Sequence, residues 1–212
     1  MKAATAVFVG GIAAAVALGG YVIYELTRAD LKLPNLPQAI SKGPDCSKAK
    51  PLTAPTLVTF YDFARELAVA WKPDVVLVRL DHLPTSSPLQ INGSSRQWTA
   101  GFHSPSANKS MLVHTGDGTL HCSTAPGSVA SRIPAFKGEP MLDGSALYRI
   151  AEKNGKAEMK KGLGVGVNLW PDADDGHATW LLGFYDKQGY PSGPRVVVNA
   201  SSGAVEKIEK SK

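Results

Sequence analysis

The chain has 212 residues, 43% of them hydrophobic and 19% charged, with 21 glycines and 15 prolines. This globular composition excludes a transmembrane bundle, a collagen, a coiled coil and a disordered chain, and the length allows one large domain or two small ones. The net charge of +5 comes from 23 basic and 18 acidic residues that form no block of like charge, which argues against a nucleic-acid-binding protein.

The first predicted element is a membrane helix. Residues 3–24 contain neither a charged residue nor proline, and this length of helix spans the hydrocarbon core of about 30 Å. Because only Lys2 precedes the run and a long domain follows it, we expect residues 1–28 to anchor the chain with its bulk outside the cytoplasm. A cleaved signal peptide is the alternative, since Ala17 to Gly19 offers the small residues that a signal peptidase prefers.

Small residues recur along one side of the expected membrane helix. Gly11, Ala15 and Gly19 follow one another at a spacing of four, which lets another helix approach closely in the bilayer. We predict that these three residues pack against a membrane partner. Alternatively, a segment rich in alanine and glycine produces this spacing by composition alone.

Proline-rich stretches divide the rest of the chain. Residues 29–56 contain five prolines and no periodic pattern, so we predict a tether there. Residues 124–140 form a second such stretch, a linker between two patterned segments. The predicted modules are therefore residues 57–123 and residues 141–212.

The first module reads as a helix followed by four strands. Apolar residues recur at helical spacing over residues 57–71, and Pro73 stops the pattern. The strand-like runs that follow are residues 75–80, 96–103, 111–114 and 119–122.

The second module repeats that order. A short helix is predicted over residues 144–153 with Asp143 as its N-cap, and the strands are predicted at residues 163–169, 178–186, 195–199 and 204–208. The segments QWTAGF and TWLLGF align Trp98 with Trp180 in the second strand of each module. This match predicts an internal duplication in which each tryptophan faces the helix of its own module.

The segment VVVNASSGAVEKI at residues 196–208 resembles the last hairpin of PepSY-like domains, which run V-x-V-D-A-x-T-G-x-V. Asn199 stands where that pattern has Asp, and Ser202 where it has Thr. The resemblance implies a small α+β unit and a family associated with extracytoplasmic regulation, including proposed inhibition of peptidases. Tandem units of one helix and four strands also resemble the β-lactamase-inhibitor architecture, another binding fold.

The predicted fold class is therefore α+β: an N-terminal transmembrane helix followed by two tandem modules, each with one helix packed on an antiparallel four-stranded sheet. The two cysteines, Cys46 and Cys122, are too few for a zinc site and predict one disulfide. Closing about 75 residues would stabilise the fold by roughly 4 kcal/mol in an oxidising compartment. Two unrelated buried thiols are the alternative.

Motifs for catalysis or metal binding are weak. His103, His114 and His121 belong to neighbouring predicted strands, so a three-histidine metal site is conceivable, but a solvated sheet face is favoured. Residues 172–176 imitate the start of a calcium loop with broken spacing, which favours a polar turn. We predict no metal, no cofactor and no catalytic residue.

Three aromatic residues outside the expected cores remain: Trp170, Tyr185 and Tyr190 are the predicted binding residues, although they could instead cover the far side of the sheet. We predict a binding or regulatory protein of the bacterial envelope, anchored in the inner membrane with its bulk in the periplasm. It would act by contacting another envelope or membrane protein and not as an enzyme. A small-molecule or peptidoglycan-sensing module and an envelope hydrolase are the alternatives.

Overall fold

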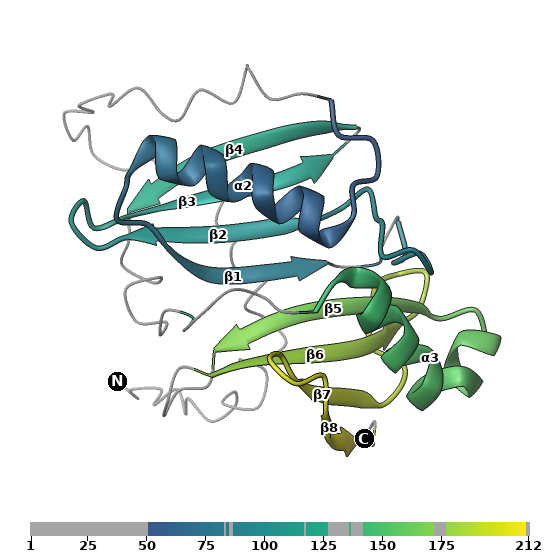
Figure 1. Ribbon diagram of the computed structural model, residues 1–212. Coiled ribbons are helices and arrows are strands. Elements are labelled where there is room, and N and C mark those ends of the chain that lie inside the picture. Colours follow the sequence, from purple (N-terminus) through teal and green to yellow (C-terminus); the bar gives the residue numbers. More distant parts are fainter. Residues whose placement is uncertain are drawn as a thin grey trace, which may run out of the picture. The chain divides into compact units, whose positions relative to one another are not determined.

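The described part of the chain forms one antiparallel sheet of eight strands with two helices (Figure 1). The computed structural model describes residues 51–82, 84, 87–116, 118–126, 136, 142–171 and 177–210. The strand order across the sheet is β4-β3-β2-β1-β5-β6-β7-β8. The elements are α2 (Leu57–Trp71), β1 (Val76–His82), β2 (Thr99–Ser104), β3 (Lys109–Gly116), β4 (Thr119–Pro126), α3 (Gly144–Lys160), β5 (Gly164–Pro171), β6 (Ala178–Tyr185), β7 (Arg195–Asn199) and β8 (Val205–Glu209).

The predicted membrane anchor lies outside the described residues, as do Gly11, Ala15 and Gly19 within it. Most of the predicted tether lies outside them as well. Within the part of the chain that the structure describes, no helix is both long enough and apolar enough to cross a membrane. The anchor and its helix-packing stripe therefore stay predictions.

The first helix has the predicted bounds, whereas the second is longer than predicted. Helix α2 begins after Thr56, whose side chain accepts a hydrogen bond from the backbone N–H of Thr59. Helix α3 begins after the predicted cap Asp143 but continues to Lys160. Gly155 has the non-helical angles φ −135° and ψ 31°, so it bends the helix without ending it.

The prediction of two separate four-stranded modules is wrong, because β1 and β5 join all eight strands into one sheet. Three residue pairs form this seam: Leu80 with Leu169, Asp81 with Asn168 and His82 with Val167. Two separate sheets would each leave the backbone groups of an inner edge strand unpaired. The antiparallel seam gives those groups partners.

The two halves of the sheet correspond residue by residue. Ala100 and Leu182 occupy equivalent positions in the QWTAGF and TWLLGF segments. Ala100 pairs with Leu80, and Leu182 pairs with Val167. Leu80 in β1 is therefore the counterpart of Val167 in β5.

The same correspondence makes the seam symmetric. Counting on from Leu80, Asp81 is the counterpart of Asn168 and His82 is the counterpart of Leu169. Asp81 thus pairs with Asn168, which is its own counterpart. Replacing each residue of the Leu80–Leu169 pair by its counterpart gives the pair Val167–His82, which is the other flanking pair. A local two-fold axis passes through the Asp81–Asn168 pair, as it does in a symmetric dimer interface.

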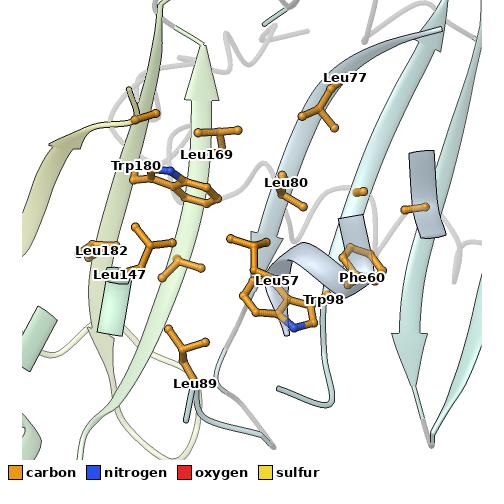
Figure 2. Packing of buried hydrophobic residues seen from close by; sticks show 14 of the residues in the cluster. Leu57, Phe60, Leu77, Leu80, Leu89, Trp98, Leu147, Leu169, Trp180 and Leu182 are labelled. Atoms are coloured by element: carbon orange, nitrogen blue, oxygen red, sulfur yellow. The ribbon is translucent and has the colours of Figure 1, made fainter. Parts of the chain in front are cut away.

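One hydrophobic core extends across both halves, on the face of the sheet that the helices cover. Trp98 and Trp180 are both fully buried in it, as predicted, and Figure 2 shows them on either side of the seam. Trp98 immediately precedes β2, and its Nε1 donates a hydrogen bond to the carbonyl of Pro55. The Phe60 ring from α2 lies 6.3 Å from the Trp98 ring.

Candidate functional site

The face of the sheet opposite the two helices carries most of the side chains of functional interest. Alternation along each strand sends core residues toward α2 and α3 and the intervening residues toward this second face. We call it the helix-free face and define it by Thr99, Leu112, His114, Asn168, Trp170, Leu181, Tyr185 and Val197. These side chains are half-buried, except that Trp170 is 50% exposed.

Four residues form a central polar cluster whose middle is the Asp81–Asn168 pair on the two-fold axis: Arg79, Asp81, Asn168 and Tyr185. Arg79 Nε donates a hydrogen bond to Oδ2 of Asp81, which is buried. Burial raises the pKa of the Asp81 carboxyl, and the Arg79 guanidinium opposes that rise. Because an unpaired buried charge is costly, Arg79 stabilises the ionised form of Asp81.

The ring of Tyr185 lies across two glycines that face each other on β5 and β6. A Cβ atom on Gly166 or Gly183 would come within 2.6 or 2.7 Å of this ring, so both positions require glycine. Burial raises the pKa of the Tyr185 phenol, and the charge of Asp81 adds to the rise, whereas a hydrogen bond with Asn168 opposes it. The phenol is therefore protonated at neutral pH.

The central polar cluster has the chemistry of a structural network. The Asp81 carboxylate is engaged by Arg79, and burial keeps the Tyr185 phenol protonated. A general base needs a free lone pair aimed at a substrate. Because the Asp81 carboxylate already has a partner within the protein and the Tyr185 phenol keeps its proton, the cluster favours a rigid surface over proton transfer.

The three histidines weighed as an alternative metal site do not come together. His114 and His121 face each other across β3 and β4, with ring centroids 5.2 Å apart. His103 instead pairs with Ser110, four residues along β3 from His114. Among the described residues, no three metal-ligating side chains of the His, Cys, Asp and Glu types gather around one point. The disfavoured three-histidine alternative therefore does not occur on these strands.

The three predicted aromatic residues do not form one site. Tyr185 pairs with Gly164, six strand positions from Trp170, which is roughly 20 Å along β5. Tyr190 is 68% exposed and follows β6 in a turn, where its carbonyl accepts a hydrogen bond from the backbone N–H of Asp186. The backbones of Tyr185 and Tyr190 thus lie at one end of β5 and β6, with the Tyr185 ring reaching back over Gly166 and Gly183, and Trp170 lies toward the other end.

Trp170 belongs to an apolar strip, defined by Trp170, Leu181 and Val197, that crosses β5, β6 and β7. Leu181 pairs directly with Val197, and Trp170 lies diagonally across the β5–β6 pair from Leu181. In the first half of the sheet, Thr99 and His114 stand at the positions equivalent to Leu181 and Val197. The apolar strip is therefore a property of the second half of the sheet.

Two other predicted features lie partly or wholly outside the described residues. Cys122 on β4 is disulfide-bonded, whereas its predicted partner Cys46 lies outside the described part of the chain. The calcium-like segment at residues 172–176 also lies outside it. The Cys46–Cys122 pairing stays a prediction.

Sequence reasoning missed Arg79, Asp81 and Asn168. Asp81 offered a signal, because it and Arg79 are charges of opposite sign, two residues apart, in the strand run VVLVRLDH. Pairing it with Asn168 requires the seam register, which no local pattern contains.

Comparison with protein-family models, curated proteins and solved structures finds no match for this chain. The resemblance to PepSY-like domains therefore stays a prediction that rests on residues 196–208 alone. Any functional argument depends on the helix-free face itself.

Proposed function

We propose that this chain is a binding protein of the bacterial envelope, anchored in the inner membrane with its bulk in the periplasm, and that its helix-free face docks another envelope or membrane protein. It acts by contact and not by catalysis. The apolar strip is the observation that carries the proposal.

The apolar strip has the composition of an interface centre. Trp170 is 50% exposed, and Leu181 and Val197 lie beside it on the neighbouring strands. Tryptophan dominates the binding energy of many protein interfaces when flanking apolar residues exclude water around it. The antiparallel sheet beneath holds the three side chains in a fixed arrangement, so little conformational entropy is lost on docking.

The disulfide bond of Cys122 supports an extracytoplasmic location. Disulfides persist in oxidising compartments such as the periplasm and are rare in the cytosol. An apolar run at residues 3–24 would retain the chain at the membrane. N-terminal sequencing of protein recovered from the membrane fraction should therefore find the chain intact, whereas a start near Gly20 in a soluble fraction would contradict the anchor.

The docking proposal is tested by capture from solubilised membranes with the full chain as bait. Trp170→Ala should abolish capture of the partner, or weaken it by about 30-fold for a hot-spot loss of 2 kcal/mol. Tyr190→Ala is the matched control, because it removes an exposed aromatic ring that lies outside the apolar strip. Equal capture by the wild type and Trp170→Ala would contradict docking on this strip.

A further inference from the structure

Strand β8 is an outer edge of the sheet, with a neighbour on one side only among the described strands. Its residues Val205–Glu209 are exposed, apart from the half-buried Glu209. Ile208 is an apolar side chain on this edge and is 49% exposed. Helix α3 packs on β5 and β6, and β7 separates these strands from the edge (Figure 1). The edge can therefore accept another strand.

The hydrogen bonds of the turn before β8 show which backbone groups point out of the sheet. Asn199 donates its N–H to the carbonyl of Ala204 at 2.9 Å, so the backbone of Asn199 faces β8. Backbone direction alternates along a strand, so Val197 faces β8 as well, and its partner Lys207 faces back toward β7. The next residue, Ile208, therefore presents its N–H and C=O to the open edge.

The charges of β8 select one register for pairing with a second copy of this chain. Two identical antiparallel strands are related by a two-fold axis, and strand alternation requires that this axis pass through one residue and its own copy. Four of the five residues from Glu206 to Lys210 are charged, and centring the pair on any of these four sets like charges face to face. Ile208 is the one uncharged residue among the five, and its backbone groups already point out of the sheet.

Centring the pair on Ile208 makes every flanking pair complementary in charge. Lys207 then lies opposite Glu209 of the second copy, and Glu206 lies opposite Lys210 of the second copy. Each of these pairs occurs twice by symmetry. The two exposed Ile208 side chains meet at the axis, and their backbones exchange a pair of hydrogen bonds.

We infer that two copies of this chain pair β8 with β8, antiparallel and centred on Ile208. The seam within the chain has the same arrangement, since β1 and β5 are joined by three residue pairs about a local two-fold axis. A ladder of so few residues buries less than the about 800 Å² per partner of a standard stable interface. The dimer is therefore weak and dissociates at the micromolar concentrations of a size-exclusion run.

Self-pairing brings two docking surfaces to one side of the dimer, a consequence that rests on the docking function proposed above. Residues paired across antiparallel strands point to the same face, so the helix-free faces of the two copies are continuous. The two β7 strands are then three strand spacings apart, which is about 14 Å. Two apolar strips lie on one surface, and a partner with two matching sites would bind both.

Sedimentation equilibrium of the full chain in a density-matched detergent, at concentrations up to about 1 mM, tests the pairing. The wild type should show a monomer–dimer equilibrium. Ile208→Lys should be monomeric, because it sets two ammonium groups face to face at the axis. Glu152→Lys, a charge change at an exposed position of α3, is the matched control and should dimerise like the wild type. Unchanged melting temperatures should show that these exposed substitutions leave the fold intact.

Charge reversal separates this register from any other self-association. Glu206→Lys and Lys210→Glu should each raise the Kd of the dimer by about tenfold, because each creates two like-charge pairs. The double variant restores opposite charges and should recover the wild-type Kd. A monomeric wild type, a dimer that persists in Ile208→Lys, or a double variant as weak as the single ones would overturn the inference.

The docking proposal is read separately from the pairing. Trp170→Ala leaves β8 unchanged and should dimerise like the wild type even where it abolishes capture of the envelope partner. Ile208→Lys keeps the apolar strip and should still capture that partner as a monomer.

Discussion

His82 is a buried imidazole whose protonation should control stability in acid. Its ring is fully buried 5.2 Å from the Trp98 ring, and its Nε2 lies 2.7 Å from the carbonyl oxygen of Ser87. Because a carbonyl can only accept, Nε2 carries the proton and Nδ1 holds a lone pair. Nδ1 has no partner among the described residues, and its protonation would put a charge into the core.

The size of this effect follows from the shift of the His82 pKa. Burial lowers that pKa from 6.5 to about 4, against the opposing hydrogen bond with Ser87. The unfolded chain therefore binds this proton more readily than the folded chain does. The free energy of unfolding is highest above pH 6.5 and decreases as the pH falls from 6.5 to about 4. At 1.36 kcal/mol per pH unit the loss is about 3 kcal/mol, a large share of a typical unfolding free energy of 5–15 kcal/mol.

The substitution His82→Leu isolates this contribution, since its counterpart across the two-fold axis is Leu169. The Ser87 carbonyl keeps a hydrogen bond from Ser95 Oγ at 3.0 Å, so the change leaves that oxygen satisfied. Urea unfolding of both proteins, followed by tryptophan fluorescence from pH 7.5 to pH 4, measures the difference in free energy. Other groups, including Asp81, titrate in both proteins and largely cancel.

We expect His82→Leu to gain about 3 kcal/mol relative to the wild type between pH 7.5 and pH 4. His103→Gln, which removes an imidazole from the opposite face, should keep the pH dependence of the wild type. Parallel stability curves for the wild type and His82→Leu would refute the assignment of a neutral core imidazole.

Three substitutions test the core, and a thiol titration tests the disulfide. Trp98→Ala and Trp180→Ala should each cost about 3–5 kcal/mol and, because one core spans both halves, lower a single unfolding transition seen by calorimetry. Gly155→Ala should destabilise by about 1–3 kcal/mol in urea unfolding, since a Cβ there would lie 1.8 Å from the Phe184 ring. Thiol titration of the unfolded, unreduced chain should find Cys122 blocked; two free thiols per chain would contradict the disulfide.

Local patterns predicted the local elements of this fold. The apolar spacing that defines residues 57–71 and the turn before Arg195–Asn199 involve neighbours in sequence, and the structure has those bounds. The end of α3 was missed because Asn154-Gly155 looks like a stop signal. Gly155 instead allows close contact with the Phe184 ring of β6, and α3 continues past this contact to Lys160.

The candidate site was predictable only in part, for the same reason. Strand parity placed Trp170 away from the core, Tyr185 was expected outside it beside a turn, and both lie on the helix-free face. The apolar strip and the central polar cluster depend on registers between strands. The seam register that sets Asp81 opposite Asn168 joins residues far apart in the chain, so no single segment specifies it.

The seam nevertheless left a trace in the sequence. Leu80, Asp81 and His82 are all buried, which means that β1 is covered on both faces at the seam. Residues 75–78 form a short apolar run without alternation, which is typical of an interior strand. Such a strand left at an edge is a template for pairing with another chain.

This argument predicts the behaviour of the second half expressed alone. Residues 142–210 would expose the edge of β5, and the two-fold symmetry of the seam allows two copies to pair β5 with β5, with Asn168 facing Asn168 and Val167 facing Leu169. We expect a concentration-dependent dimer by light scattering after size exclusion. Lys in place of Val167, on the core face beside the new seam, should prevent it. A stable, folded monomer of residues 142–210 would contradict this argument, because it would show that β5 does not need a partner strand at its edge.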